Sequence, residues 1–256
     1  SFSNGSDGSI RNITFTGSLN NPYVVYASAS SSSPGVLTLD NCKFVDLQGR
    51  GLQSSSYITA NISNCVFAGN IGPPNDPTGS AIRIGGNNTL NLSGCLFYDN
   101  QAITNYGDHQ GTIYGSYDYT INIDQCTFYD NGGEGSIAIY DHNSSGGSDY
   151  ITVSNSIFYS DIIDAPYTTL SATYSLIYDV EGTGNLYNDP LFCDADSSDF
   201  TLHDNSPCVG TGDEGANMGA LGVGCGTYSG ETGDDVTVGE SPFYISPDGN
   251  EFASGT

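Results

Sequence analysis

The chain repeats one local pattern: a short alternation of apolar and polar residues, then a run of four residues that ends in a large apolar side chain. Such an alternation predicts a β-strand with one buried face. The repeats follow one another at intervals of about 20–30 residues, which is typical of a solenoid. The seven runs are NITF (Asn12–Phe15), NCKF (Asn41–Phe44), NCVF (Asn64–Phe67), GCLF (Gly94–Phe97), QCTF (Gln125–Phe128), NSIF (Asn155–Phe158) and YSLI (Tyr174–Ile177).

Stacking these repeats sorts their residues into columns along the solenoid axis. The second and fourth residues of each run are expected to point inward, as is the residue three positions before the second. This odd spacing predicts a bend at the first residue of the run, which is often Asn and tolerates a left-handed backbone. The fourth-residue column is Phe15, Phe44, Phe67, Phe97, Phe128, Phe158 and Ile177. The second-residue column is Ile13, Cys42, Cys65, Cys95, Cys126, Ser156 and Ser175.

A third short strand is expected in several repeats, at Ser80–Ile84, Gly111–Tyr114 and Gly135–Tyr140. Three parallel strands per coil, stacked about 4.8 Å apart, describe a parallel β-helix. On these columns, residues 8–225 resemble the secreted bacterial family of right-handed parallel β-helix repeat proteins, which share the pectate-lyase-like fold. The expected fold class is therefore all-β, a right-handed parallel β-helix solenoid with about seven or more coils.

Charge narrows the possible partners. The 256 residues include 4 Lys and Arg against 29 Asp and Glu, a formal net charge of -25. Phosphate binding needs clustered Lys and Arg, so nucleic acid and anionic membrane surfaces are disfavoured as partners. No apolar run is long enough to be inserted in a membrane. The sequence does not begin with Met and opens within a repeat, which suggests a piece of a longer protein.

The cysteines form two groups. The four in the inward column predict a ladder of buried thiols, because free Cys packs as a small apolar residue; a zinc site is the alternative. The segment DPLFCDADSSDFTLHDNSPCVG, followed by GALGVGC, resembles the closing segment of many secreted β-helix proteins. That resemblance implies a Cys193–Cys208 disulfide and leaves Cys225 unpaired. A disulfide there implies an extracellular or cell-surface location.

The two outward faces differ in chemistry. The outward columns of the first strand are Ser, Thr, Asn and Asp apart from Arg11, which predicts either a solvated face or a flat surface for glycan or ordered water. The outward columns of the second strand form an apolar strip, larger than a monomer usually exposes. A loop or tail of the same chain, a protein partner, or sugar stacking on the tyrosines could cover it. The strip consists of Leu96, Tyr98, Tyr129, Ile157, Tyr159, Leu176 and Tyr178.

The sequence offers few candidate catalytic or metal-binding residues. Asp194, Asp196 and Asp199 are spaced as a possible calcium site, with a set of turn residues as the alternative. Polysaccharide lyases of this fold use a Lys or Arg base, but the spacing of Arg11, Lys43, Arg50 and Arg83 brings no two together. Asp46, Asp99, Asp130 and Asp179 recur at equivalent corners, where turn formation explains them better than glycosidase chemistry. No cofactor other than calcium is expected.

Residues 1–225 are therefore expected to form one β-helix that ends in the closing segment 193–225, with 226–240 as a linker. Residues 241–256 resemble an opening strand of the same family, so they are a tail strand or the start of another module. The expected function is a non-catalytic, extracellular structural or adhesive module that self-associates, or contacts neighbouring modules, through the apolar strip and the tail. The alternative is a β-helix protein that degrades or binds polysaccharide.

Overall fold

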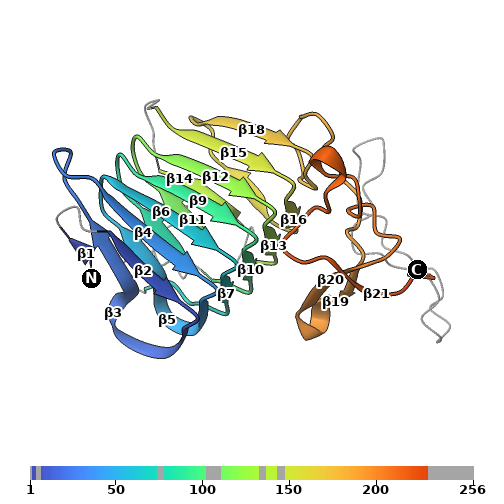
Figure 1. The fold of residues 1–256 in the computed structure, drawn as a ribbon, viewed down its shortest axis with the longest axis horizontal. Helices are drawn as coiled ribbons and strands as arrows, with labels where there is room; N and C mark the ends of the chain where they lie inside the picture. Colours follow the sequence, from blue (N-terminus) through green and yellow to red (C-terminus); the bar gives the residue numbers. More distant parts are fainter. Residues whose placement is uncertain are drawn as a thin grey trace, which may run out of the picture.

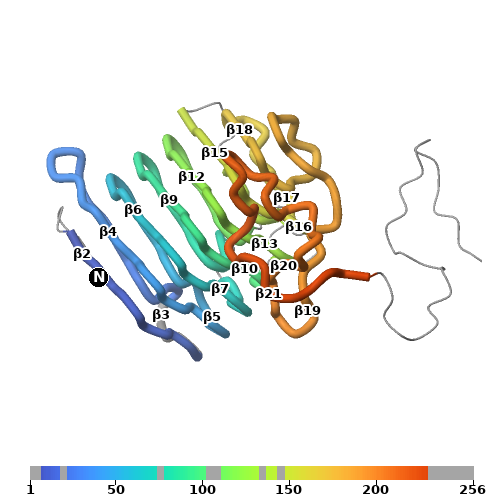
Figure 2. Tube along the Cα trace, turned by 45° about the vertical axis from the view of Figure 1, so that its right-hand side comes forward, coloured from blue at the N-terminus to red at the C-terminus, as the bar shows by residue number. Residues whose placement is uncertain are grey.

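The computed structural model describes residues 2–3, 7–73, 78–101, 111–132, 137–142 and 148–229. Residues 230–240 of the expected linker and the whole of the tail 241–256 lie outside this range. The described chain winds into stacked coils of short strands, and a closing segment then runs back along one side (Figures 1 and 2). The expected all-β parallel β-helix is confirmed.

One parallel sheet contains seven strands, each from a successive coil. Neighbours pair in strict order with residues of the same column opposite each other, for example Asn61, Asn91 and Asn122. The strands are β2 (Gly8–Arg11), β4 (Gly35–Asp40), β6 (Ile58–Ser63), β9 (Thr89–Ser93), β12 (Thr120–Asp124), β15 (Tyr150–Ser154) and β18 (Thr169–Thr173).

The other two strips of strands join into one 11-stranded sheet, because β3 (Thr14–Ser28) and β5 (Lys43–Ser54) continue across the corner between them. The strip that carries the repeated Phe contains β7 (Val66–Ala68), β10 (Leu96–Tyr98), β13 (Thr127–Tyr129) and β16 (Ile157–Tyr159). The third strip contains β8 (Ile82–Ile84), β11 (Ile113–Gly115), β14 (Ile137–Asp141) and β17 (Ile162–Asp164), close to the predicted ranges. The short β1 (Phe2–Ser3) pairs with β3.

The closing segment builds a small three-stranded sheet of its own. Strand β20 (Asp199–His203) lies between β19 (Phe192–Asp194), which is antiparallel to it, and β21 (Val223–Cys225), which is parallel. Two 3₁₀ turns, η1 (Ala195–Ser197) and η2 (Asp213–Gly215), lie in this segment.

The predicted bend is present at every repeat. The first residue of each run has a positive φ of 48–61°, the left-handed region that Asn and Gly adopt most readily. A second left-handed column follows the Phe strip, which confirms that the repeated aspartates form turns. The first column is Asn12, Asn41, Asn64, Gly94, Gln125, Asn155 and Tyr174; the second is Asp46, Gly69, Asp99, Asp130, Ser160 and Asp179.

The predicted inward columns form the core. The Phe rings from Phe15 to Phe158 stack face to face with centroids 4.5–5.0 Å apart. The four thiols beside them are free and buried, as expected for the cysteine ladder. Burial raises the pKa of Cys42, so this thiol stays protonated near neutral pH. Ile13, in the first coil, is the exception and is 43% exposed.

A buried ladder of amides follows the second corner. Asn70, Asn100 and Asn131 pass a hydrogen bond from each Nδ2 to the next side-chain oxygen at 2.7–2.8 Å, and the last bond ends on Asp161. Each Nδ2 also donates to a backbone carbonyl of the preceding coil, at Phe44, Phe67 or Phe97. Burial raises the pKa of Asp161 to about 7, although the hydrogen bonds from Asn131 oppose that shift.

Replacing Phe97 by Ala should lower the free energy of unfolding by about 3–5 kcal/mol, because it empties a site in the middle of a fully buried aromatic stack. Denaturant melts measure the change. The control Tyr150→Ala, on the exposed side of β15, should cost less than about 1 kcal/mol. A loss below about 1 kcal/mol for Phe97→Ala would contradict the inward register.

Asp161→Asn should stabilise the protein at pH 8 and have little effect near pH 4. The folded pKa of Asp161 is above the unfolded value, so its stabilising contribution is complete below about pH 4 and is lost as pH rises to about 7. A shift from 3.8 to about 7 corresponds to about 4 kcal/mol. An amide here could also donate to the Phe128 carbonyl, as Asn131 does to that of Phe97.

Unfolding free energies of the wild type and the variant, measured from pH 4 to pH 8, check this prediction. Asp179→Asn is the matched control, because Asp179 is exposed and its left-handed backbone suits Asn equally well. A gap between the wild type and Asp161→Asn that stays constant across this pH range would show that Asp161 is not held protonated by burial.

Candidate functional site

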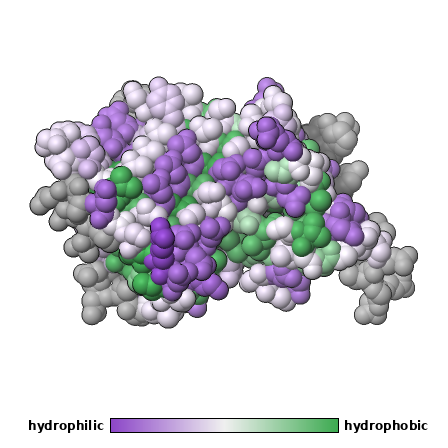
Figure 3. Space-filling model, in the orientation of Figure 1, coloured by the Kyte–Doolittle hydropathy of each residue, from purple (hydrophilic) through white to green (hydrophobic). Residues whose placement is uncertain are grey.

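The outer face of the seven-stranded sheet presents polar side chains on every described coil. Strand alternation turns two of its columns outward in register, and the structure confirms the predicted polar composition. Figure 3 shows hydrophilic and near-neutral residues spread over this side of the molecule. The central column is Ser9, Thr38, Asn61, Asn91, Asn122, Thr152 and Ser171, and the column beside it is Arg11, Asp40, Ser63, Ser93, Asp124, Ser154 and Thr173.

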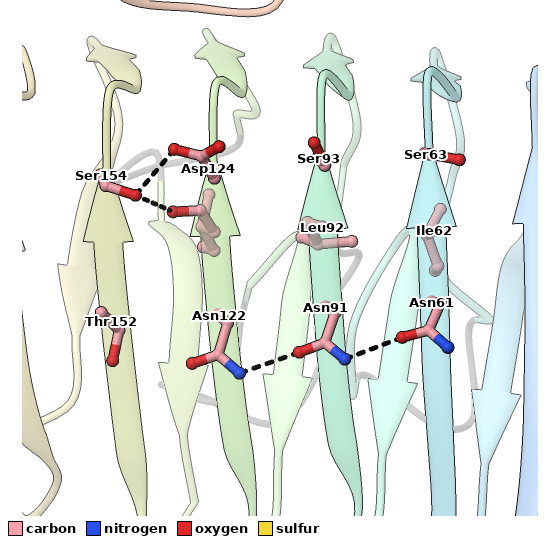
Figure 4. A pocket seen from close by; sticks show the side chains of 11 residues that line it. Asn61, Ile62, Ser63, Asn91, Leu92, Ser93, Asn122, Asp124, Thr152 and Ser154 are labelled. Atoms are coloured by element: carbon pink, nitrogen blue, oxygen red, sulfur yellow. Dashed lines mark hydrogen bonds between the residues drawn. The ribbon is translucent and has the colours of Figure 1, made fainter. Parts of the chain in front are cut away.

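A shallow groove of about 380 Å³ lies across four strands of this face. At its centre Asn122 donates to Asn91, and Asn91 donates to Asn61, both at 2.8 Å (Figure 4). These bonds hold the three amides parallel. They use one N–H of each donor, which leaves the second N–H of Asn91 and the second N–H of Asn122 outside this ladder.

The same side-chain arrangement flanks the amide ladder at two places. Asp124 accepts hydrogen bonds from Ser154 Oγ at 2.8 Å and from Asn155 Nδ2 at 3.0 Å. Asp40 accepts equivalent bonds from the serine and the corner asparagine of its next coil, at 2.8 Å and 3.3 Å. The hydrogen bonds from Ser63 and Asn64 lower the pKa of Asp40, so its carboxylate is ionised at neutral pH.

This pair of acids is not placed for glycoside hydrolysis. Asp40 and Asp124 lie in one column, three coils apart, which corresponds to about 14 Å at the spacing of parallel strands. The two carboxylates of a glycosidase lie about 5–9.5 Å apart. Asp40 and Asp124 are therefore too far apart to act together as such a pair.

The apolar strip is covered by the closing segment of the same chain. Phe200 lies 5.0 Å from the rings of both Tyr98 and Tyr129, and Phe192 packs edge-on against Tyr129 and Tyr159. Burial raises the pKa of the Tyr129 and Tyr159 hydroxyls. Figure 2 shows this segment running beside β10, β13 and β16.

The aliphatic part of the strip is buried in the same contact. Leu96, Ile157 and Leu176 are at most 8% exposed, and the last two pack with Leu202 and Met218. The expectation that this strip is a binding or assembly face is therefore wrong for these residues, because their partner is internal. Tyr178 alone is open to solvent, at 61% exposed. Tyr178 follows the last Phe-type run, Tyr174–Ile177.

The disulfide implied by the closing-segment resemblance is also corrected. Cys193 is bonded to Cys225, with Cα atoms 6.0 Å apart, whereas Cys208 is a free, buried thiol. Both cysteines lie on strands that pair with β20, and the register shifts beside Cys193 and beside Cys225. A regular sheet would hold β19 and β21 too far apart for a disulfide, so the bond depends on this irregular pairing. Cys208 packs instead into the aliphatic cluster with Met218 and Leu202. His203 Nδ1 lies 3.1 Å from Cys225 Sγ.

The three aspartates of the expected calcium site do not converge in the structure. Asp194 accepts a bond from the Ser197 N–H and caps η1, and Asp199 accepts from the backbone N–H and the hydroxyl of Thr201. In the described residues, the one group of three or more metal-type ligands that comes together is Cys193, His203 and Cys225. The alternative of turn residues is therefore the better interpretation of Asp194, Asp196 and Asp199.

The structure places two of the arginines next to one glutamine, Gln53. Arg50 lies within β5, is fully buried, and donates to Gln53 Oε1 at 2.7 Å and to the Gly79 carbonyl. Gln53 in turn is in register with Arg83, which lies over the Tyr114 ring at 5.8 Å. Full burial makes Arg50 a structural residue. Gln53 and Arg83 are 30 residues apart in the sequence, so the cluster of Arg50, Gln53 and Arg83 is recognised only from the strand register.

The chain matches the family described as right handed beta helix region over residues 2–161, which is more than half of its length. With the stacked parallel strands, this match defines a right-handed β-helix, and the chain belongs to that family. No curated protein matches the chain. The described residues include no helix long and apolar enough to cross a membrane.

Peptide mapping without reduction should find Cys193 linked to Cys225. An alkylating reagent should reach Cys208 and the cysteine ladder only after the protein unfolds, because all five thiols are buried. A Cys193–Cys208 peptide, or rapid labelling of Cys208 in the folded protein, would contradict the arrangement of the closing sheet.

Proposed function

We propose that this β-helix is a non-catalytic extracellular module that binds a neutral polysaccharide along the groove of the seven-stranded sheet. The observation that carries the proposal is the hydrogen-bonded ladder of Asn61, Asn91 and Asn122, which presents equivalent amide groups on successive coils. Side chains held in place by their neighbours lose little entropy on binding. A regular chain of sugars offers hydroxyl groups at repeated positions, which is the ligand that such a row of donors and acceptors recognises best.

The side chains that line the groove favour a neutral polysaccharide over an acidic one. The side chains that line it include Asp124 but neither Lys nor Arg. A polysaccharide of uronic acids would meet this carboxylate and the strongly negative net charge without a compensating cation. Degradation is less well supported, because Asp40 and Asp124 are too far apart and Arg50 is buried. Self-association through the apolar strip is not proposed, because the closing segment occupies that strip.

An extracellular location is part of the proposal. The Cys193–Cys225 disulfide supports it, because such bonds persist in oxidising compartments. The low content of Lys and Arg supports a partner that is neither nucleic acid nor an anionic membrane.

Binding can be tested by affinity electrophoresis and calorimetry with a neutral β-glucan, an amino-sugar polymer and polygalacturonate. The wild type should bind the neutral polymer, and Asn91→Ala should weaken that binding by about tenfold, equivalent to ~1.4 kcal/mol, by removing the central amide. Ser171→Ala is the matched control, since Ser171 is exposed in the same column but outside the groove. Equal losses for both variants, or binding of polygalacturonate alone, would contradict this assignment.

A further inference from the structure

The closing sheet brings together three side chains that the proposed function does not use. Cys193, His203 and Cys225 come from β19, β20 and β21, one from each strand. Their ligand atoms all lie within 4.8 Å of one another, and each residue is half-buried. His203 and Cys225 are opposite each other in the strand register, so the backbone itself sets their separation.

We propose that, when the disulfide is reduced, Cys193, His203 and Cys225 bind one Zn²⁺ ion. Two thiolates and one imidazole are a preferred ligand set for zinc, with Zn–S bonds of about 2.3 Å and Zn–N bonds of about 2.0 Å. Tetrahedral coordination would place the two sulfurs about 3.8 Å apart and each sulfur about 3.5 Å from the nitrogen. His203 Nδ1 already lies 3.1 Å from Cys225 Sγ. The same nitrogen also donates to the Gly226 carbonyl oxygen, so metal binding requires it to give up this bond and its proton.

The surroundings fit an ion with three protein ligands and one solvent ligand. The site is only half-buried, so water can occupy the fourth position. Tyr228 packs on the His203 ring at 5.3 Å, which restricts its orientation. The net charge of -25 raises the local concentration of any cation.

The disulfide and the zinc site exclude each other. Two molecules of an external thiol reduce the Cys193–Cys225 bond, giving two protein thiols and one disulfide of the reductant. Zn²⁺ then binds both sulfurs as thiolates, and two protons pass to solvent. The disulfide in the oxidised protein and the zinc coordination in the reduced protein each link β19 to β21 beside β20. The closing segment therefore keeps Phe192 and Phe200 over the apolar strip in both redox states.

The full chain can be reduced with a water-soluble phosphine, which is itself oxidised to the phosphine oxide. The reduced protein is then titrated with Co²⁺ as a spectroscopic probe for zinc. The reduced protein should bind one Co²⁺ with a sulfur-to-cobalt charge-transfer band and tetrahedral d–d bands, and Zn²⁺ should displace it. The oxidised protein should show neither band. His203→Ala should weaken binding by about tenfold or more, because one of three protein ligands is lost.

Two further variants separate this site from the other thiols. The double variant Cys193→Ser with Cys225→Ser should lose the charge-transfer band, and Cys208→Ser should keep it. Zn²⁺ should raise the melting temperature of the reduced wild type but not of the double variant. This comparison remains valid even if reduction itself lowers the stability of the fold. The absence of a band in reduced, folded protein, a band that survives in the double variant, or a melting temperature unchanged by Zn²⁺ would each overturn the proposal.

Discussion

The left-handed corner residue is the constraint on which the rest of this β-helix depends. A residue with positive φ at the start of each run turns the chain between two strands within a single position. The turn keeps Phe in one column and the thiols in another, coil after coil. Gly and short polar side chains adopt this conformation at the lowest cost, so the corner favours Asn and Gly, although Gln125 and Tyr174 also occupy it. Their polar groups then need partners, and the same corner of the neighbouring coil supplies them, as in the bond from Asn41 Nδ2 to Asn12 Oδ1.

Once the register is set, it decides the chemistry of each outer face. The seven-stranded sheet turns Asn61, Asn91 and Asn122 outward as a bonded row, which is why this face can offer a fixed array to a ligand. The Phe strip turns tyrosines and aliphatic residues outward on the same coils. Leaving that strip in water would forgo about 25 cal/mol for each Å² of apolar area, so the closing segment lies over it. One face is therefore covered within the chain, and the other presents a row of bonded polar side chains.

The sequence allowed the coils, the inward columns and the corners to be predicted, because a repeated pattern reports the same local structure many times. The Asn70–Asn100–Asn131 ladder was missed, although a Phe followed three residues later by Asn or Asp recurs at each of these coils. The closing segment was harder to predict because it occurs once. Its disulfide depends on how β19, β20 and β21 pair, and its contact with the apolar strip depends on a fold-back that no local pattern encodes. The cluster of Arg50, Gln53 and Arg83 was also not predicted, because it depends on strand pairing that no local pattern encodes.

Hydroxyl-radical footprinting of the tyrosines, read by mass spectrometry, is the most direct test of this account. It measures whether the apolar strip is covered while the polar sheet is exposed to solvent. Tyr150, on the polar sheet, and Tyr178 and Tyr187, beyond the strip, are exposed and should be oxidised rapidly. Tyr98, Tyr129 and Tyr159 should react much more slowly, because Phe192 and Phe200 pack against their rings. Oxidation of these three at the rate of Tyr187 would mean that the strip is open and that the account of the closing segment is wrong.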